Sequence, residues 1–234
     1  MKNKKWMKKG ILATSLVGLI SIGGAIAYFT DAEEATNQVT VGNVRIDLEE
    51  EEWDKVPEEE KQNITPNQTL AKDPKIINTG DNTAFVFLDV SVPVAEVITA
   101  NEDGSKNPKE LTELFSYQTD SNWTQVGKMI EVKDKSDKVI AHKYLYAYGD
   151  STSCTSLAPG SETSELFQSV LFANIIEGQL LPDGSDIEGS TLHIDIHAHA
   201  IQTNNLTENK VNSPEEVWKV YSQQNENADG FLKV

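Results

Sequence analysis

The chain has 234 residues, a formal net charge of −17 and a single cysteine, Cys154. A chain of this length can bury a substantial core, whereas one cysteine forms neither an internal disulfide nor a cysteine-rich zinc site. Contact with phosphate requires a cationic surface, so the excess of 37 acidic over 20 basic residues argues against nucleic-acid binding. We therefore expect no nucleic-acid partner.

The first segment has the order of a secretory signal peptide. Residues 1–10 carry five lysines and no acidic residue, and an apolar run follows immediately. Ala25 and Ala27 form a small-x-small cleavage site, which predicts a cut before Tyr28. The alternative is an uncleaved anchor, because the apolar run is long enough to cross a bilayer. We expect contact with a membrane only through the uncleaved signal peptide.

Cleavage at this position divides the chain into a signal peptide, 1–27, and one mature domain, 28–234. Within that domain, alternation of apolar and polar residues predicts strands. The predicted strands are 38–48, 76–78, 84–92, 129–132, 139–148, 165–173 and 190–202. Because turns separate the strands and no βαβ alternation occurs, we predict a mainly β fold, an antiparallel β-sandwich with a few peripheral helices.

Three segments differ from this strand pattern. The apolar spacing after Pro108 predicts a short amphipathic helix over 108–117. A C-terminal helix is predicted over 213–225, where Ser213 is the N-cap and Glu216 the reciprocal capping residue. The acidic stretch 49–61 reads as a solvated loop or a short helix.

Three histidines near the end of the last predicted strand are candidate metal ligands. His193, His197 and His199 alternate along the strand and therefore share one face with Asp195. Imidazole groups with a nearby carboxylate can bind zinc. The alternative is that this face is the solvated side of the strand. His142 is a fourth ligand only if the fold brings its strand close.

Enzyme chemistry is not supported by the residues themselves. The zinc-peptidase motif His-Glu-x-x-His, the Gly-x-Ser-x-Gly elbow and the phosphate-binding loops do not occur in the sequence. Cys154 has no recognisable partner base. Residues 99–110 match some positions of a calcium-binding loop, but Thr99 stands where the first acidic ligand belongs, so we interpret the segment as an Asp-Gly surface turn. We predict no cofactor, with zinc as the alternative.

Several short segments resemble the TasA/camelysin family. They are GAIAYFTD at residues 24–31, VGNV at 41–44, IDL at 46–48, KDP at 72–74 and AHAIQ at 198–202. The resemblance implies export from a Gram-positive bacterium and release by a signal peptidase of the SipW type. It also implies a jelly-roll sandwich, and for some relatives fibres of the biofilm matrix. Other relatives carry a metallo-endopeptidase label under the name camelysin.

The resemblance leads to three hypotheses of function. The first is a secreted structural protein of the extracellular or biofilm matrix, which forms fibres when the segment 28–38, freed by cleavage, pairs as a donor strand with the next subunit. Tyr28, Phe29, Val39 and Val41 then supply the apolar contacts; a loose tail is the alternative for this segment. The second is a zinc metallo-endopeptidase, and the third an adhesin. Expected partners are further copies of the chain, an accessory matrix protein and the signal peptidase.

Overall fold

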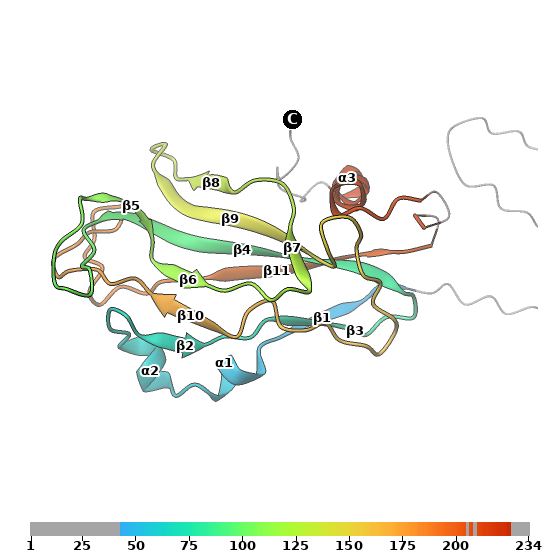
Figure 1. Ribbon diagram of the computed structural model, residues 1–234, viewed down its shortest axis with the longest axis horizontal. Coiled ribbons are helices and arrows are strands. Elements are labelled where there is room, and N and C mark those ends of the chain that lie inside the picture. The colour runs from blue at the N-terminus through green and yellow to red at the C-terminus, as the bar shows by residue number, and fades with distance from the viewer. Residues whose placement is uncertain (1–42, 205, 208–209, 226–234) are drawn as a thin grey trace, which may run out of the picture. The chain divides into compact units, whose positions relative to one another are not determined.

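The computed structural model describes residues 43–204, 206–207 and 210–225 (Figure 1). Its helices are α1 (Glu51–Lys55), α2 (Glu58–Gln62) and α3 (Pro214–Gln224). Its strands are β1 (Ile46–Glu49), β2 (Thr69–Ala71), β3 (Lys75–Asn78), β4 (Ala84–Val97), β5 (Glu110–Glu113), β6 (Phe115–Tyr117), β7 (Trp123–Gln125), β8 (Ile130–Lys133), β9 (Val139–Tyr148), β10 (Ser169–Phe172) and β11 (Asp195–Gln202). The predicted mainly β architecture is confirmed.

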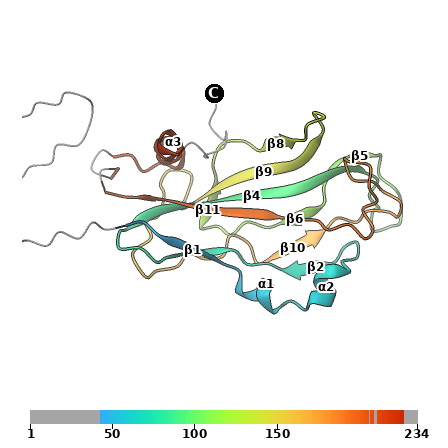
Figure 2. The ribbon, with the colours of Figure 1, turned by 180° about the vertical axis from the view of Figure 1, so that it is seen from behind.

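All ladders between these strands are antiparallel. The larger sheet has the order β11-β4-β9-β7, with β8 added to β9 and β5 added to β4. A second sheet has the order β2-β10-β6, and β1 pairs with β3. Figures 1 and 2 show β2 and β10 on one side of β11 and β4, with α3 on the other. The jelly-roll connectivity stays a prediction.

The main core lies on the inner face of β4. Val86, Leu88 and Val90 alternate along that strand and are completely buried. They belong to one apolar cluster with Val170 and Phe172 of β10, so the two sheets pack against each other. Burial of apolar side chains between two sheets is the main source of stability for such a fold.

The outer face of β4 carries a smaller apolar cluster. Phe85 and Phe87 point away from the main core and pack with Val217 and Trp218 of α3. The rings of Phe87 and Trp218 are tilted, with centroids 5.2 Å apart. Because α3 covers this end of the sheet, both faces of β4 are buried there, which explains its nearly continuous apolar sequence.

The helix predicted over 108–117 is wrong. This segment forms β5 and β6, and β5 pairs with the last residues of β4. Leu114 and Phe115 are buried while Leu111 is 39% exposed, so the helical spacing of the three side chains does not define one packed face. Pairing with the long strand β4 outweighs the local preference.

The other helical segments agree more closely with the sequence. The C-terminal helix begins at Pro214 after Ser213, but the predicted capping box takes another form: the Ser213 hydroxyl donates to the Glu216 carboxylate at 2.8 Å, and no side chain caps the backbone. The acidic stretch contains α1 and α2. The strands predicted over 165–173 and 190–202 are shorter in the structure, as β10 and β11.

Candidate functional site

A buried carboxylate, that of Asp89, lies on the outer face of the larger sheet. Asp89 alternates with Phe85 and Phe87 on β4, so the three side chains point to the same face. Only 4% of the Asp89 side chain is exposed. A charge that is buried to this degree requires partners, because an unpaired buried charge is strongly destabilising.

Three side chains from two neighbouring strands surround this carboxylate. His197 lies opposite Asp89 in the ladder between β11 and β4, with its Nδ1 3.1 Å from Oδ1. His199 Nε2 is 2.7 Å from Oδ2. On the other side, Lys143 of β9 places its Nζ 3.3 Å from Oδ1. We call Asp89, Lys143, His197 and His199 the Asp89 cluster.

His199 connects the Asp89 cluster to α3. Its Nδ1 is 3.1 Å from the Tyr221 hydroxyl, and its ring meets those of Trp218 and Tyr221 edge-on, with centroids 5.2 and 5.4 Å away. Because Nε2 faces a carboxylate, we assign the proton to Nε2, and Nδ1 accepts the hydroxyl proton of Tyr221. The imidazole of His199 thus makes one hydrogen bond to Asp89 on the sheet and one to Tyr221 on α3.

The surroundings of Asp89 favour its ionised form. Burial raises the pKa of Asp89. The hydrogen bond from His199, the charge of Lys143 and the hydrogen bond from His197 lower it, and their sum is larger than the effect of burial. The pKa of Asp89 therefore lies below its ordinary value. Burial and the charge of Asp89 raise the pKa of Tyr221. Tyr221 therefore remains a protonated donor to His199 at neutral pH.

The exposed end of the Asp89 cluster is His197, whose side chain is 63% exposed. A carboxylate that orients an imidazole is an arrangement used for proton transfer, and covalent catalysis needs a nucleophile as well. Cys154 packs in the same outer apolar cluster but is 6% exposed, and burial and Asp150 raise its pKa to about 12. Its thiol is therefore protonated and inert at neutral pH. The contacts of the Asp89 cluster fit a structural connection between the sheet and α3 better than a catalytic dyad.

The histidines predicted as metal ligands are not brought together as a set of three. His197 and His199 both contact Asp89, whereas His193 is exposed and precedes β11. His142 points to the opposite face of the sheet, where its Nδ1 is 2.8 Å from Glu113. Among the residues that the structure describes, no group of three or more His, Cys, Asp or Glu side chains could hold a metal ion. Zinc binding stays a prediction.

A second polar cluster, which the sequence analysis did not identify, centres on Glu113. This carboxylate accepts a hydrogen bond from the Tyr144 hydroxyl and lies against His142. Nearby, the hydroxyls of Tyr117 and Tyr146 are 3.0 Å apart. Burial is the main cause that raises the pKa of Tyr144 and of Tyr117, so neither ionises at neutral pH. The alternation of His142, Tyr144 and Tyr146 along one face of β9 is the sequence signal that could have revealed it.

The free side of β11 is a second candidate site. β11 ends its sheet, so among the described residues it forms a ladder on one side only. Just beyond the strand, the N–H of Thr203 donates to the carbonyl of Thr83 at 3.0 Å. In an antiparallel ladder, the backbone groups of successive residues point alternately to the two sides of the strand. Because Thr203 bonds to Thr83, the odd-numbered residues of β11 direct their N–H and C=O groups to β4. The backbone groups of Ile196, Ala198 and Ala200 therefore point away from β4. We call this side the open edge of β11.

Apolar side chains along the open edge are incompletely covered. Ile196, Ala198 and Ala200 direct their side chains to the main core but are only partly buried. Val44, which precedes β1, and Ile46, its first residue, are partly buried against the same core. β1 runs close to β11 without forming a ladder with it. Among the described residues, the sandwich therefore has a seam along this strand, where no neighbouring strand pairs with the backbone and apolar surface is accessible.

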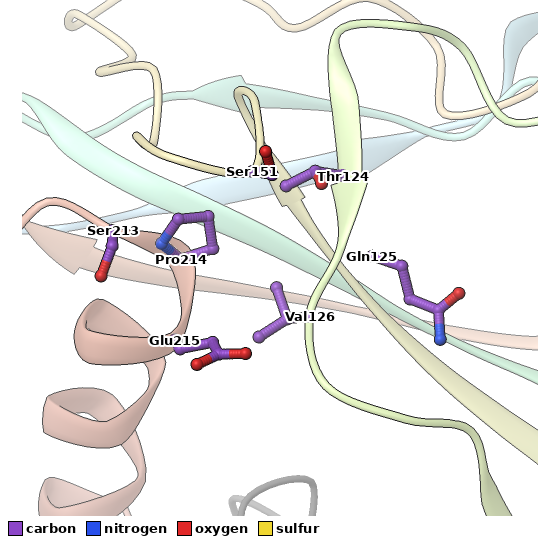
Figure 3. Close-up of a pocket in the computed structure, with 7 residues that line it drawn as sticks. All are labelled: Thr124, Gln125, Val126, Ser151, Ser213, Pro214 and Glu215. Atoms are coloured by element: carbon purple, nitrogen blue, oxygen red, sulfur yellow. The ribbon is translucent and has the colours of Figure 1, made fainter.

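Two further features lie on the surface, a turn and a small hollow. The predicted Asp-Gly turn forms: the Asp103 carboxylate accepts from the Ser105 N–H at 2.9 Å, and Gly104 has a φ of 82°, which favours glycine. A small hollow of about 160 Å³ lies between β7 and the start of α3, as Figure 3 shows. Its walls are formed by Thr124, Gln125, Val126, Ser151, Ser213, Pro214 and Glu215.

The predicted cleavage and assembly residues lie outside the described residues. They are Ala25, Ala27, Tyr28, Phe29, Val39 and Val41. Both interpretations of the segment 28–38 thus stay predictions. Within the part of the chain that the structure describes, no helix combines the length and the apolar character needed to cross a membrane.

Comparison with known proteins places the chain in a family. A family model described as camelysin metallo-endopeptidase matches residues 2–207. The chain belongs to the camelysin family. No curated protein and no solved structure matches it. The resemblance to the TasA/camelysin family is thereby confirmed, and the match extends from the first segment through β11.

The camelysin family's description implies a metal, so the donor atoms of the Asp89 cluster can be compared with what zinc requires. A catalytic zinc takes three protein ligands and leaves a fourth position open. Both nitrogens of His199 already have partners, and both oxygens of Asp89 are hydrogen-bonded. A metal would have to displace these contacts and the nearby Lys143 charge. The Asp89 cluster as folded does not fit such a site.

Proposed function

We propose that this camelysin-family chain is an exported structural protein of the extracellular matrix or cell surface, which self-assembles by adding a strand from one copy to the open edge of β11 in the next. The observation that supports this proposal is the seam along β11. There, the backbone groups of Ile196, Ala198 and Ala200 lack a neighbouring strand among the described residues, and their side chains are partly exposed. An added strand supplies the hydrogen bonds and covers the apolar surface.

The donor in this proposal is the segment 28–38, together with Val39 and Val41 that follow it in the sequence. Tyr28 and Phe29 provide large apolar side chains, and Val39 and Val41 alternate as a half-buried strand requires. Cleavage by a signal peptidase before Tyr28 frees the donor and starts assembly; an accessory matrix protein is a further partner.

Imaging of the exported protein tests the donor. We expect filaments by negative-stain electron microscopy after cleavage, and none when residues 28–38 are deleted. Mass spectrometry of the amino terminus establishes that cleavage has occurred before Tyr28. Globular monomers of the cleaved, intact protein at high concentration would contradict the proposal.

A single backbone group tests the acceptor. The change Ala198→Pro removes an N–H that points to the open edge and leaves the ladder to β4 intact. Ala198→Val is the matched control, because it keeps the N–H and favours strand structure. We expect Ala198→Pro to abolish filaments while its circular dichroism spectrum is unchanged, and Ala198→Val to form them. Filaments of Ala198→Pro at the control's level would rule out this edge.

The family's printed description favours a second candidate, a zinc-dependent endopeptidase using His193, His197 and His199. This function requires rearrangement of the Asp89 cluster. It predicts one bound zinc per chain by mass spectrometry under native conditions and proteolysis that a chelator stops. Zinc binding that persists in the triple variant His193→Ala, His197→Ala, His199→Ala would exclude these ligands.

A further inference from the structure

A charged segment closes the side of the sandwich next to β2. Residues 50–62, which contain α1 and α2, follow β1 and are here called the strap. Neither helix has a buried residue. Trp53 and Val56 are partly buried against the main core. The strap thus gains little from apolar burial and depends on its polar contacts with the body.

Asp73, just after β2, holds the start of α1. Its carboxylate accepts hydrogen bonds from the N–H groups of Glu52 and Trp53, at distances of 2.9 to 3.2 Å. Asp73 is 6% exposed. A carboxylate at the start of a helix satisfies N–H groups that otherwise lack acceptors.

Two lysines beside Asp73 hold the strap by ion pairs. Lys72 Nζ is 2.8 Å from Glu50, in a pair whose side chains are 7% and 20% exposed. Lys75 Nζ is 2.8 Å from Glu51, and its side chain is 11% exposed. The hydrogen bonds with Glu51 and Glu162 raise the pKa of Lys75 well above its ordinary value. Both lysines therefore pair with strap carboxylates, and Lys75 pairs with Glu162 as well.

Trp53 adds an aromatic contact to this arrangement. Its ring has the ammonium group of Lys72 4.6 Å from the centroid and that of Lys61 4.8 Å away. Lys72 thus contacts the strap twice, through the Glu50 carboxylate and through the Trp53 ring. Cation–π contacts of this kind strengthen as water is excluded.

The strap lies where β2 has no neighbouring strand. β2 ends the sheet β2-β10-β6, and pairing with the β10 side continues from Asn67 to Lys72. Figures 1 and 2 both show α1 and α2 on the side of β2 away from β10. α1 contacts β2 directly. The strand β2, Thr69–Ala71, would otherwise offer its free side as a template for another strand.

We propose that the strap is an edge guard: held by Lys72, Asp73 and Lys75, it prevents the β2 edge from pairing with a second copy of this chain. The guard is a contact within the chain, so the inference does not require assembly at β11. Where that assembly does occur, the guard keeps the β2 edge from competing with β11 as an acceptor. A guard held by charges rather than by apolar burial is a part that opens locally before the fold unfolds.

The test compares Lys72→Met with Lys55→Met in the full exported chain. Both changes remove one lysine charge near the strap, but Lys55 pairs with Glu52 at the surface, with side chains 64% and 57% exposed. We expect Lys72→Met to lose hydrogen-exchange protection over 50–71 and to self-associate by analytical ultracentrifugation. In the associated species, protection at 69–71 should return while 50–62 stays unprotected. Lys55→Met should behave as the parent chain.

The outcomes of this test decide whether the strap guards the β2 edge, independently of whether assembly occurs at β11. If the strap opens but the protein associates no more than the control, or association protects segments other than β2, the inference is overturned. If Lys72→Met does not fold, Trp53→Ala replaces it, because this change weakens the strap and leaves the ion pairs in place; the same outcomes apply. In electron microscopy, the variant is compared with any filaments that the parent chain forms through β11. Lateral bundles that appear only in the variant then indicate pairing at the β2 edge.

Discussion

The change Asp89→Asn tests whether the Asp89 cluster stabilises the fold. The substitution keeps the shape of the side chain but removes the charge that faces Lys143, His197 and His199. Breaking a buried ion pair by removing one partner costs about 3–5 kcal/mol. Because His197 is 63% exposed and the amide retains one acceptor, we expect the lower end, about 3 kcal/mol at neutral pH.

The pH dependence of this effect has a definite sign. The pKa of Asp89 is lowered in the folded protein, so its contribution is complete above the unfolded value of about 3.9 and is lost as the pH falls through the folded pKa. The wild type should therefore be more stable than the variant at neutral pH, and the two stabilities should converge as the pH falls below about 4.

Urea denaturation followed by tryptophan fluorescence measures the difference at neutral pH, near pH 4 and near pH 2.5. The matched control is Asp81→Asn, because the Asp81 side chain belongs to an exposed residue in a turn. We expect the control to change the free energy of unfolding by less than about 0.5 kcal/mol. An Asp89→Asn effect below about 1 kcal/mol at neutral pH, or one that persists unchanged into strong acid, would refute the reasoning.

Two further substitutions and one labelling experiment probe other parts of the fold. Trp218→Ala should lower stability by about 3–5 kcal/mol in thermal unfolding, because Trp218 is 1% exposed; a smaller loss would mean that α3 is weakly docked. Cys154 should react with a thiol reagent only as fast as the protein opens, and rapid labelling of folded protein would contradict its burial. Asn78→Ala should cost about 3 kcal/mol by urea denaturation, since its amide donates to the buried carbonyls of Asn82 and Leu157; an unchanged midpoint would show that water replaces it.

The strands were predictable because alternation is local. Segments 84–92 and 139–148 correspond closely to β4 and β9, since the apolar run of the first and the strand pattern of the second are visible in their own residues. The Asp89 cluster was not predictable in this way. Asp89 is a conspicuous charge inside an apolar strand, but its partner His197 is 108 residues away, and only the ladder register brings them together.

The failed helix over 108–117 has a physical explanation of the same kind. Leu111, Leu114 and Phe115 have helical spacing, yet the end of β4 offers backbone hydrogen bonds to β5 that the isolated segment lacks. The open edge of β11 likewise depends on which strands are neighbours. Alternation predicts that a strand exists, and it does not predict whether the strand lies inside a sheet or at its end.

In the proposed assembly, the outer side chains of β11 and the backbone groups along its open edge have different roles. The side chains of His197 and His199 tie the strand to Asp89 and α3, whereas the backbone groups of Ile196, Ala198 and Ala200 remain directed to the open edge. An edge strand held rigid by its outer side chains loses less conformational entropy when another strand pairs with it. In the proposed assembly, the Asp89 cluster thus prepares the accepting edge without contacting the added strand. It follows that Asp89→Asn should weaken filament formation more than its effect on global stability explains, whereas Trp53→Ala should not.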